Sequence, residues 1–198
     1  MHNSFMAALA SPDQPVPGGG AAAAYAGSVG LALLTKIVRL EMHRYPDVSE
    51  RSLWQDLFNQ VSALSASLYR LRDEDGKSYM FLAKTKTSGT KQEEVAAAVM
   101  QAIECPMQIL EQTHKALTCV SVAAKHCKRH LLSDLRVVCE LIKASGQGAY
   151  HICVANLRIM TDPITQADYQ NRLTRLHARS CELLKLAQAS ILRSDHKL

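Results

Sequence analysis

Apolar residues alternate at spacings of four and three along the segment that begins near Ser49. The run consists of Leu53, Leu57, Val61, Leu64, Leu68 and Leu71. This spacing places all six side chains on one face of an α-helix, which is typical of a helix packed against others in a bundle. Such a face has to be covered by further helices. The pattern therefore favours an all-α fold.

The remainder of the chain repeats this helical periodicity and offers no β-rich block. We expect helices at about residues 21–42, from residue 49, from residue 90, at 133–160 and at 165–192, after a short apolar segment at residues 5–9. The 198 residues suit one domain, so we predict a single helical bundle of about five to six helices over residues 1–198. Its apolar faces exceed what one subunit can cover, which predicts a homodimer.

Composition narrows the setting in which the protein works. The six cysteines form no Cys-x-x-Cys pair and the N-terminus lacks a signal-peptide pattern, so we expect a reduced, cytoplasmic protein. The most apolar segment, residues 21–34, is shorter than the roughly 20 residues of a membrane span, and we interpret it as a buried helix with no membrane partner. The net charge of +5 is spread along the chain, so we expect no nucleic-acid partner.

Three consecutive glycines lead directly into the first long predicted helix. Gly18, Gly19 and Gly20 follow Pro15-Val16-Pro17. Glycines allow close approach of the backbone, and a helix start offers unpaired N–H groups and the positive end of the helix dipole. This loop is therefore a candidate site for an anion or a carbonyl oxygen. The alternative is a flexible loop with an N-terminal cap.

Asp75 continues the apolar register described above by one further step. A carboxylate in register with six core positions is unexpected, because burying an unpaired charge is costly. Asp75 is therefore a candidate catalytic residue. A structural ion pair with a lysine or arginine of a neighbouring helix is the alternative. No set of His, Cys, Asp and Glu has a spacing typical of metal ligands, so we expect no metal site.

The first candidate for a catalytic carboxylate is Asp134, ahead of Asp75, because it follows Ser133 at a predicted helix start, where the helix dipole keeps a carboxylate ionised. Ser133 and Asp134 are equally typical of a plain helix cap, with Ser133 as the N-cap. In an unbroken helix, Asp134, Gly148, Ile152 and Asn156 lie within about 80° of one another, as the wall of a groove would require. Alternatively, Gly148 permits close helix packing and Asn156 is a satisfied core amide.

Several motifs occur together in one order. They are Pro-Val-Pro-Gly-Gly-Gly before an Ala-rich helix, Asp73-Glu74-Asp75 with Tyr79, Cys105-Pro106-Met107, Ser133-Asp134-Leu135-Arg136-Val137, Gly148-Ala149-Tyr150, Asn156-Leu157 and Thr161-Asp162. In this order they resemble the family of formiminotetrahydrofolate cyclodeaminases and methenyltetrahydrofolate cyclohydrolases, which includes the cyclodeaminase domain of formiminotransferase-cyclodeaminase. The resemblance extends from about residue 5 to residue 192.

The resemblance implies an all-helical domain that dimerises and binds a tetrahydrofolate in a groove near the subunit interface. It implies cyclisation of 5-formiminotetrahydrofolate with loss of ammonia, or hydrolysis of 5,10-methenyltetrahydrofolate to 10-formyltetrahydrofolate. Asp134 and Asp75 are then the predicted catalytic residues, and the folate is the substrate, with no separate cofactor. The predicted substrate-binding residues are Gly18, Gly19, Gly20, Gly148 and Asn156.

Several positions depart from the family pattern, among them residues 36–41 and 87–90, and two of the departures are single residues near the expected ligand. Ala21 stands where the family usually has a serine, and Ile152 stands where an asparagine is expected. A missing buried hydrogen-bond partner costs about 1–3 kcal/mol in binding or rate. These departures favour the alternative function, which is a non-catalytic helical homodimer or ligand-binding protein on the same scaffold.

Overall fold

The computed structural model describes residues 4–45, 48–85 and 90–195. Within these ranges every regular element is helical, which confirms the all-α prediction. The elements are α1 (Ser4–Ala10), α2 (Gly19–Arg44), α3 (Val48–Lys84), α4 (Gln92–His126), the 3₁₀ turn η1 (Arg129–Leu131), α5 (Leu132–Leu157) and α6 (Pro163–Asp195).

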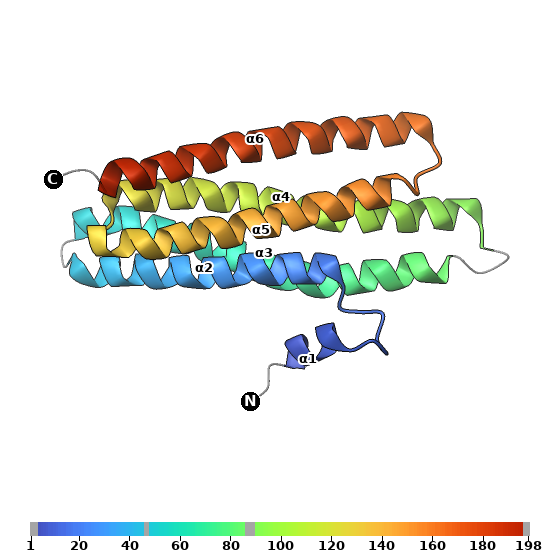
Figure 1. The fold of residues 1–198 in the computed structure, drawn as a ribbon, viewed down its shortest axis with the longest axis horizontal. Coiled ribbons are helices and arrows are strands. Elements are labelled where there is room, and N and C mark those ends of the chain that lie inside the picture. Colours follow the sequence, from blue (N-terminus) through green and yellow to red (C-terminus); the bar gives the residue numbers. More distant parts are fainter. Residues whose placement is uncertain (1–3, 46–47, 86–89, 196–198) are drawn as a thin grey trace.

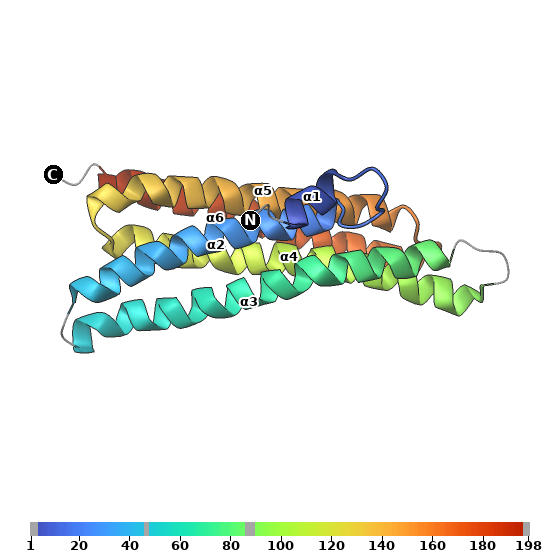
Figure 2. The same ribbon diagram turned by 90° about the horizontal axis from the view of Figure 1, so that it is seen from below.

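Helices α2 to α5 form an up-and-down bundle in which each helix packs on the next and α5 packs back on α2 (Figure 1). Helix α6 lies outside this group and covers α4 and α5. The short helix α1 stands apart from the bundle in Figure 1, and the view from below in Figure 2 places it over the start of α2. The Phe5 ring stacks on Tyr25 of α2 with ring centroids 4.7 Å apart.

The apolar register of α3 is buried as predicted, with one exception. Five of its members are no more than 7% exposed; they are Leu57, Val61, Leu64, Leu68 and Leu71. Leu53 was expected on the same face, but 36% of its surface is exposed. The neighbouring Trp54 is buried in its place, at 2% exposure. The larger side chain therefore takes the core position at this end of the helix.

Helix α2, at Gly19–Arg44, extends beyond both ends of the helix that we expected at residues 21–42. By length and composition it could cross a membrane, with a mean hydropathy of 1.5 over its most apolar 18 residues. A helix buried in a protein core has the same properties, and 56% of that window is buried here. Helix α2 packs on both α3 and α5. Its location thus agrees with the buried helix that we predicted.

The start of α5 differs from the prediction. The turn η1 leads directly into the helix, and the N-cap is Leu131, which makes no side-chain cap hydrogen bond. Ser133 is therefore not the N-cap, and that part of the prediction was wrong. Asp134 still lies in the first turn of α5, where the helix dipole favours a negative charge.

The α3 register can be tested with two leucine substitutions on the same helix. Leu68→Ala removes a fully buried side chain and should lower the free energy of unfolding by about 2–5 kcal/mol. Leu53→Ala alters an exposed position and should cost less than about 1 kcal/mol. Urea unfolding followed by circular dichroism measures both. Equal losses would contradict the assignment of Leu53 to the surface.

Candidate functional site

A pocket of about 270 Å³ lies where α2 begins. Four helices and the loop before α2 meet there, because the start of α2 lies beside the last turns of α5. Its lining consists of Pro15, Gly18, Gly19, Gly20, Asp75, Ser78, Tyr79, Leu82, Ala102, Ile152 and Asn156. The structure therefore brings together the glycine loop, Asp75 and Asn156, five of the seven residues predicted for the site.

Asp75 caps the start of α2 from the neighbouring helix α3. Its Oδ2 accepts a hydrogen bond of 2.8 Å from the backbone N–H of Ala21, one of the N–H groups that a helix start leaves unpaired. A Cβ atom at Gly20 would overlap the Asp75 carboxylate, so only glycine allows this approach. Among the described residues Asp75 has no ion-pair partner. The structure therefore does not support the alternative of a structural ion pair with a neighbouring lysine or arginine.

The other glycines differ in what surrounds them. A Cβ at Gly19 would lie 3.2 Å from Ile152 Cδ1 across the pocket, whereas one at Gly18 would meet nothing within 4 Å. A Cβ at Gly148 would lie 3.1 Å from the Cβ of Ala23. Gly148 does not line the pocket, and its place supports the packing alternative, since it lets α5 approach α2 closely.

Asn156 joins the end of α5 to α4 at the far wall of the pocket. Its Nδ2 donates a hydrogen bond of 2.6 Å to the backbone carbonyl of Ala102. This bond fixes the orientation of the amide, as expected if Asn156 is a hydrogen-bonded amide of the core. The amide oxygen makes no hydrogen bond to another described residue and remains available as an acceptor. Asn156 therefore combines a structural role with an open acceptor at the pocket.

Burial raises the pKa of the Asp75 carboxyl above its usual range, and the Ala21 N–H offsets part of this effect. A carboxyl with a raised pKa exchanges its proton closer to neutral pH, which suits general acid–base chemistry. The thiol of Cys105 lies close enough to feel the Asp75 charge, and burial raises its pKa to about 12. Cys105 therefore stays protonated and is a poor nucleophile.

Asp134 lies towards the other end of α5. The pocket is lined by Ile152 and Asn156, and Asp134 is about 33 Å from Asn156 along the helix axis at about 1.5 Å per residue. The shared helix face that we predicted is thus too long to form one groove within a single chain. The catalytic role of Asp134 stays a prediction.

Ser78 and Tyr79 line the pocket but were not among the predicted site residues. Ser78 is 2% exposed, and its hydroxyl has no hydrogen-bond partner among the described residues. Tyr79 is half exposed, at 50%. The sequence could have indicated Ser78 through its spacing, because Ser78 follows Asp75 by three residues and therefore lies on the same face of the helix.

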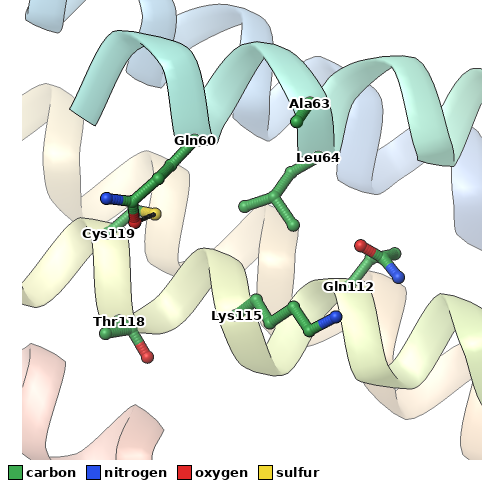
Figure 3. A pocket seen from close by; sticks show the side chains of 7 residues that line it. All are labelled: Gln60, Ala63, Leu64, Gln112, Lys115, Thr118 and Cys119. Carbon is green, nitrogen blue, oxygen red and sulfur yellow. Dashed lines mark hydrogen bonds between the residues drawn. The ribbon is translucent and has the colours of Figure 1, made fainter. Parts of the chain in front are cut away.

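A larger hollow of about 400 Å³ lies between α3 and α4 (Figure 3). Gln60 and Leu64 reach towards α4, and the Lys115 side chain extends along α4 beside them. This hollow holds no carboxylate and no unpartnered buried hydroxyl among its lining residues. The pocket at the start of α2 is therefore the better candidate for chemistry.

The fold and the pocket define a small all-helical protein that holds a carboxylate against a glycine-rich helix start. The chain belongs to the family described as formiminotransferase-cyclodeaminase, whose sequence model matches residues 1–175.

Individual relatives agree with this assignment. The chain is 26% identical over 168 residues to the formimidoyltransferase-cyclodeaminases of Gallus gallus and Rattus norvegicus. Each alignment covers 81% of this chain but only 31% of the relative, so the chain spans about a third of their length. The crystal structure of formiminotetrahydrofolate cyclodeaminase from Thermotoga maritima superimposes with a TM-score of 0.89 at 17% identity, covering 96% of this chain and 95% of that one. This likeness confirms the helical fold.

The pKa of Asp75 predicts how stability changes with pH. Because the folded pKa lies above the unfolded one, the protonated carboxyl favours the folded chain, and this contribution is lost as the pH rises through the folded pKa. Asp75→Asn is neutral at every pH. It should therefore raise the free energy of unfolding at pH 7, and the gain should disappear below about pH 4.

Urea unfolding of both proteins between pH 3.5 and 7 measures this difference. A substituted protein that is less stable than the unaltered one at pH 7 would show that the charged carboxylate stabilises the start of α2 by more than its burial costs.

Proposed function

We propose that this protein is a folate one-carbon enzyme that cyclises 5-formiminotetrahydrofolate with loss of ammonia or hydrolyses 5,10-methenyltetrahydrofolate to 10-formyltetrahydrofolate. Membership of the formiminotransferase-cyclodeaminase family supports the class of substrate. The observation that carries the proposal is the Asp75 carboxylate, which is held at a glycine-rich helix start inside a pocket and has a raised pKa.

Cyclisation requires proton transfer at two nitrogen atoms. N10 of the folate forms a bond to the carbon of the protonated formimino group, whose C=N double bond becomes single, while the N10 proton passes to the Asp75 carboxylate. The bond between that carbon and the terminal nitrogen then breaks, and Asp75 returns the proton to the departing ammonia. A single carboxyl with a raised pKa can serve as base and then as acid. The product is a cation, which the carboxylate stabilises once it is again ionised.

Hydrolysis uses the same group in a related order. Water adds to the methenyl carbon, and Asp75 accepts one of its protons. The bond from that carbon to N5 then breaks as Asp75 gives its proton to N5, the hydroxyl on the carbon loses its own proton to solvent, and the resulting formyl group remains on N10. Both reactions need only a carboxyl group and an oriented substrate, so the proposal includes no metal and no cofactor.

The rest of the pocket suits a flat, polar ligand. The start of α2 presents the backbone N–H groups of Gly19 and Gly20 to acceptor atoms. Asn156 offers its amide oxygen to a donor, and Leu82 and Ile152 supply apolar surface. These groups would hold the folate so that N10 faces the one-carbon group.

One observation favours a second candidate function. Ile152 Cδ1 lies in the pocket wall close to the Cα of Gly19, where the family resemblance leads one to expect an amide. An apolar group at this place removes a donor and an acceptor from the pocket. A protein that binds a folate without turning it over would fit this change, and an assay that reports binding and turnover separately distinguishes the two functions.

The proposal also includes a homodimer formed through α2. From Gly19 to Thr35 this helix has no charged residue on any side. Its outward side includes Val29 and Leu40, each 43% exposed. A helix that is apolar on all sides is normally buried, so a second copy of the chain would cover this face.

Catalysis can be tested with two aspartate substitutions. If Asp75 transfers the proton, Asp75→Asn should lower turnover of either folate substrate by about 100-fold or more, since general acid–base assistance is worth about 10² to 10⁴. Asp134→Asn should retain most activity if the pocket of one chain is the complete site. The near-ultraviolet absorbance of 5,10-methenyltetrahydrofolate and the release of ammonia report the two reactions.

The reverse result, with activity lost in Asp134→Asn and retained in Asp75→Asn, would assign catalysis to Asp134. Turnover of neither substrate by the unaltered protein would leave the binding function as the better explanation.

The dimer can be tested by sedimentation equilibrium at micromolar concentration. We expect twice the chain mass of 21.8 kDa for the unaltered protein. Val29→Glu places a charge on the outward face of α2 and should shift the mass towards that of a single chain. Leu186→Glu changes an exposed leucine of α6, on the other side of the bundle, and should leave the dimer intact. An unaltered protein that sediments as a single chain would refute the dimer.

A further inference from the structure

Ser78 differs from most other hydroxyl-bearing residues in the described helices. A hydroxyl within a helix commonly donates to the carbonyl three or four residues earlier. Six do so here, namely Ser28, Thr35, Thr113, Ser121, Ser180 and Ser190. The Ser78 hydroxyl has no partner among the described residues, although only 2% of the residue is exposed.

An unpartnered buried hydroxyl is costly, because it has lost its hydrogen bonds to water and gained none in return. Ser145 is the one other hydroxyl of this kind among the described residues. It is fully buried between α5 and α2, against Gly27, and lines neither the pocket at the start of α2 nor the hollow between α3 and α4. Ser78, in contrast, lines the pocket that contains Asp75. A molecule bound in that pocket could therefore supply the partner that the Ser78 hydroxyl lacks.

We infer that the Ser78 hydroxyl binds the ligand of this pocket directly, next to Asp75. Ser78 is thus a binding residue for the substrate, on the helix that supplies the carboxylate. The two side chains lie one turn apart on α3 and share a face of the helix. This inference rests on the proposed function and adds to it a residue that determines which ligands bind well.

The pair of groups defines the chemistry that this turn of α3 recognises. Asp75 Oδ2 is already bonded to the Ala21 N–H, which leaves Oδ1 for the ligand. That oxygen accepts a hydrogen bond from an N–H group, and the Ser78 hydroxyl can donate to a neighbouring acceptor. An N–H group beside a carbonyl or imine nitrogen meets both requirements. In a reduced folate, the N10–H group beside the one-carbon group on N5 has this arrangement, so the Asp75 oxygen that binds N10–H is also the one that can accept its proton.

The test uses Ser78→Ala, with Ser145→Ala as the matched control. Calorimetric titration with 5-formyltetrahydrofolate, a stable reduced folate, measures affinity, and thermal unfolding without ligand measures stability. We expect Ser78→Ala to weaken binding by about 10-fold or more, because a polar atom of the bound ligand loses its partner. Its melting temperature should be unchanged or higher, since the substitution removes an unpartnered buried hydroxyl. Ser145→Ala should show the same stability effect with unchanged affinity.

Three results would overturn the inference. Unchanged affinity in Ser78→Ala would do so and leave the proposed function standing. Weaker binding together with a lower melting temperature would show that the hydroxyl supports the fold. If the unaltered protein binds no reduced folate, the proposed function fails and this inference fails with it.

Discussion

The contact between Asp75 of α3 and the backbone N–H of Ala21 organises the whole pocket. It fixes the start of α2 against α3, and it requires glycine at residue 20. A similar contact joins the opposite end of α2 to the turn after α4, because the fully buried Glu41 accepts a 3.1 Å hydrogen bond from the Lys128 N–H. Two carboxylates thus position the two ends of one apolar helix. Asp75 also lines the pocket at the start of α2, so its contact can combine structural and chemical roles.

The fold was predictable because apolar side chains that become buried recur at helical spacing along the whole sequence. The register of α3 identified Leu57 to Leu71 correctly. The prediction that Leu53 is buried was wrong, because periodicity gives the direction of a side chain but does not show which neighbouring residue fills the space at the end of a bundle.

The prediction that Ser133 is the N-cap of α5 was wrong for a related reason. A cap depends on the path of the chain before the helix, and the turn η1 moved the helix start to Leu132.

The site was predictable only in part. The glycine loop, Asp75 and Asn156 were found by local signals, yet their meeting depends on how α2 and α5 are aligned, which no local signal reports. We predicted a shared face for Asp134 and Asn156 from their angles around the helix axis. These angles give no information on the distance between the two residues along the axis, which is about 33 Å. Gly148 gave the same signal as a ligand-contacting glycine, although it serves to bring α5 close to α2.

The departures from the family pattern at residues 21 and 152 affect the pocket differently. Residue 21 reaches Asp75 through its backbone N–H, so the change from serine to Ala21 leaves this hydrogen bond intact and removes only a side-chain donor. Ser78 places a hydroxyl in the same pocket from the facing helix. Ile152, in contrast, replaces an expected amide with an apolar wall. The carboxylate that we propose for proton transfer is thus retained, while the groups that we propose for ligand binding are rearranged. We therefore expect altered ligand selectivity to be a larger consequence of these substitutions than loss of the acid–base group.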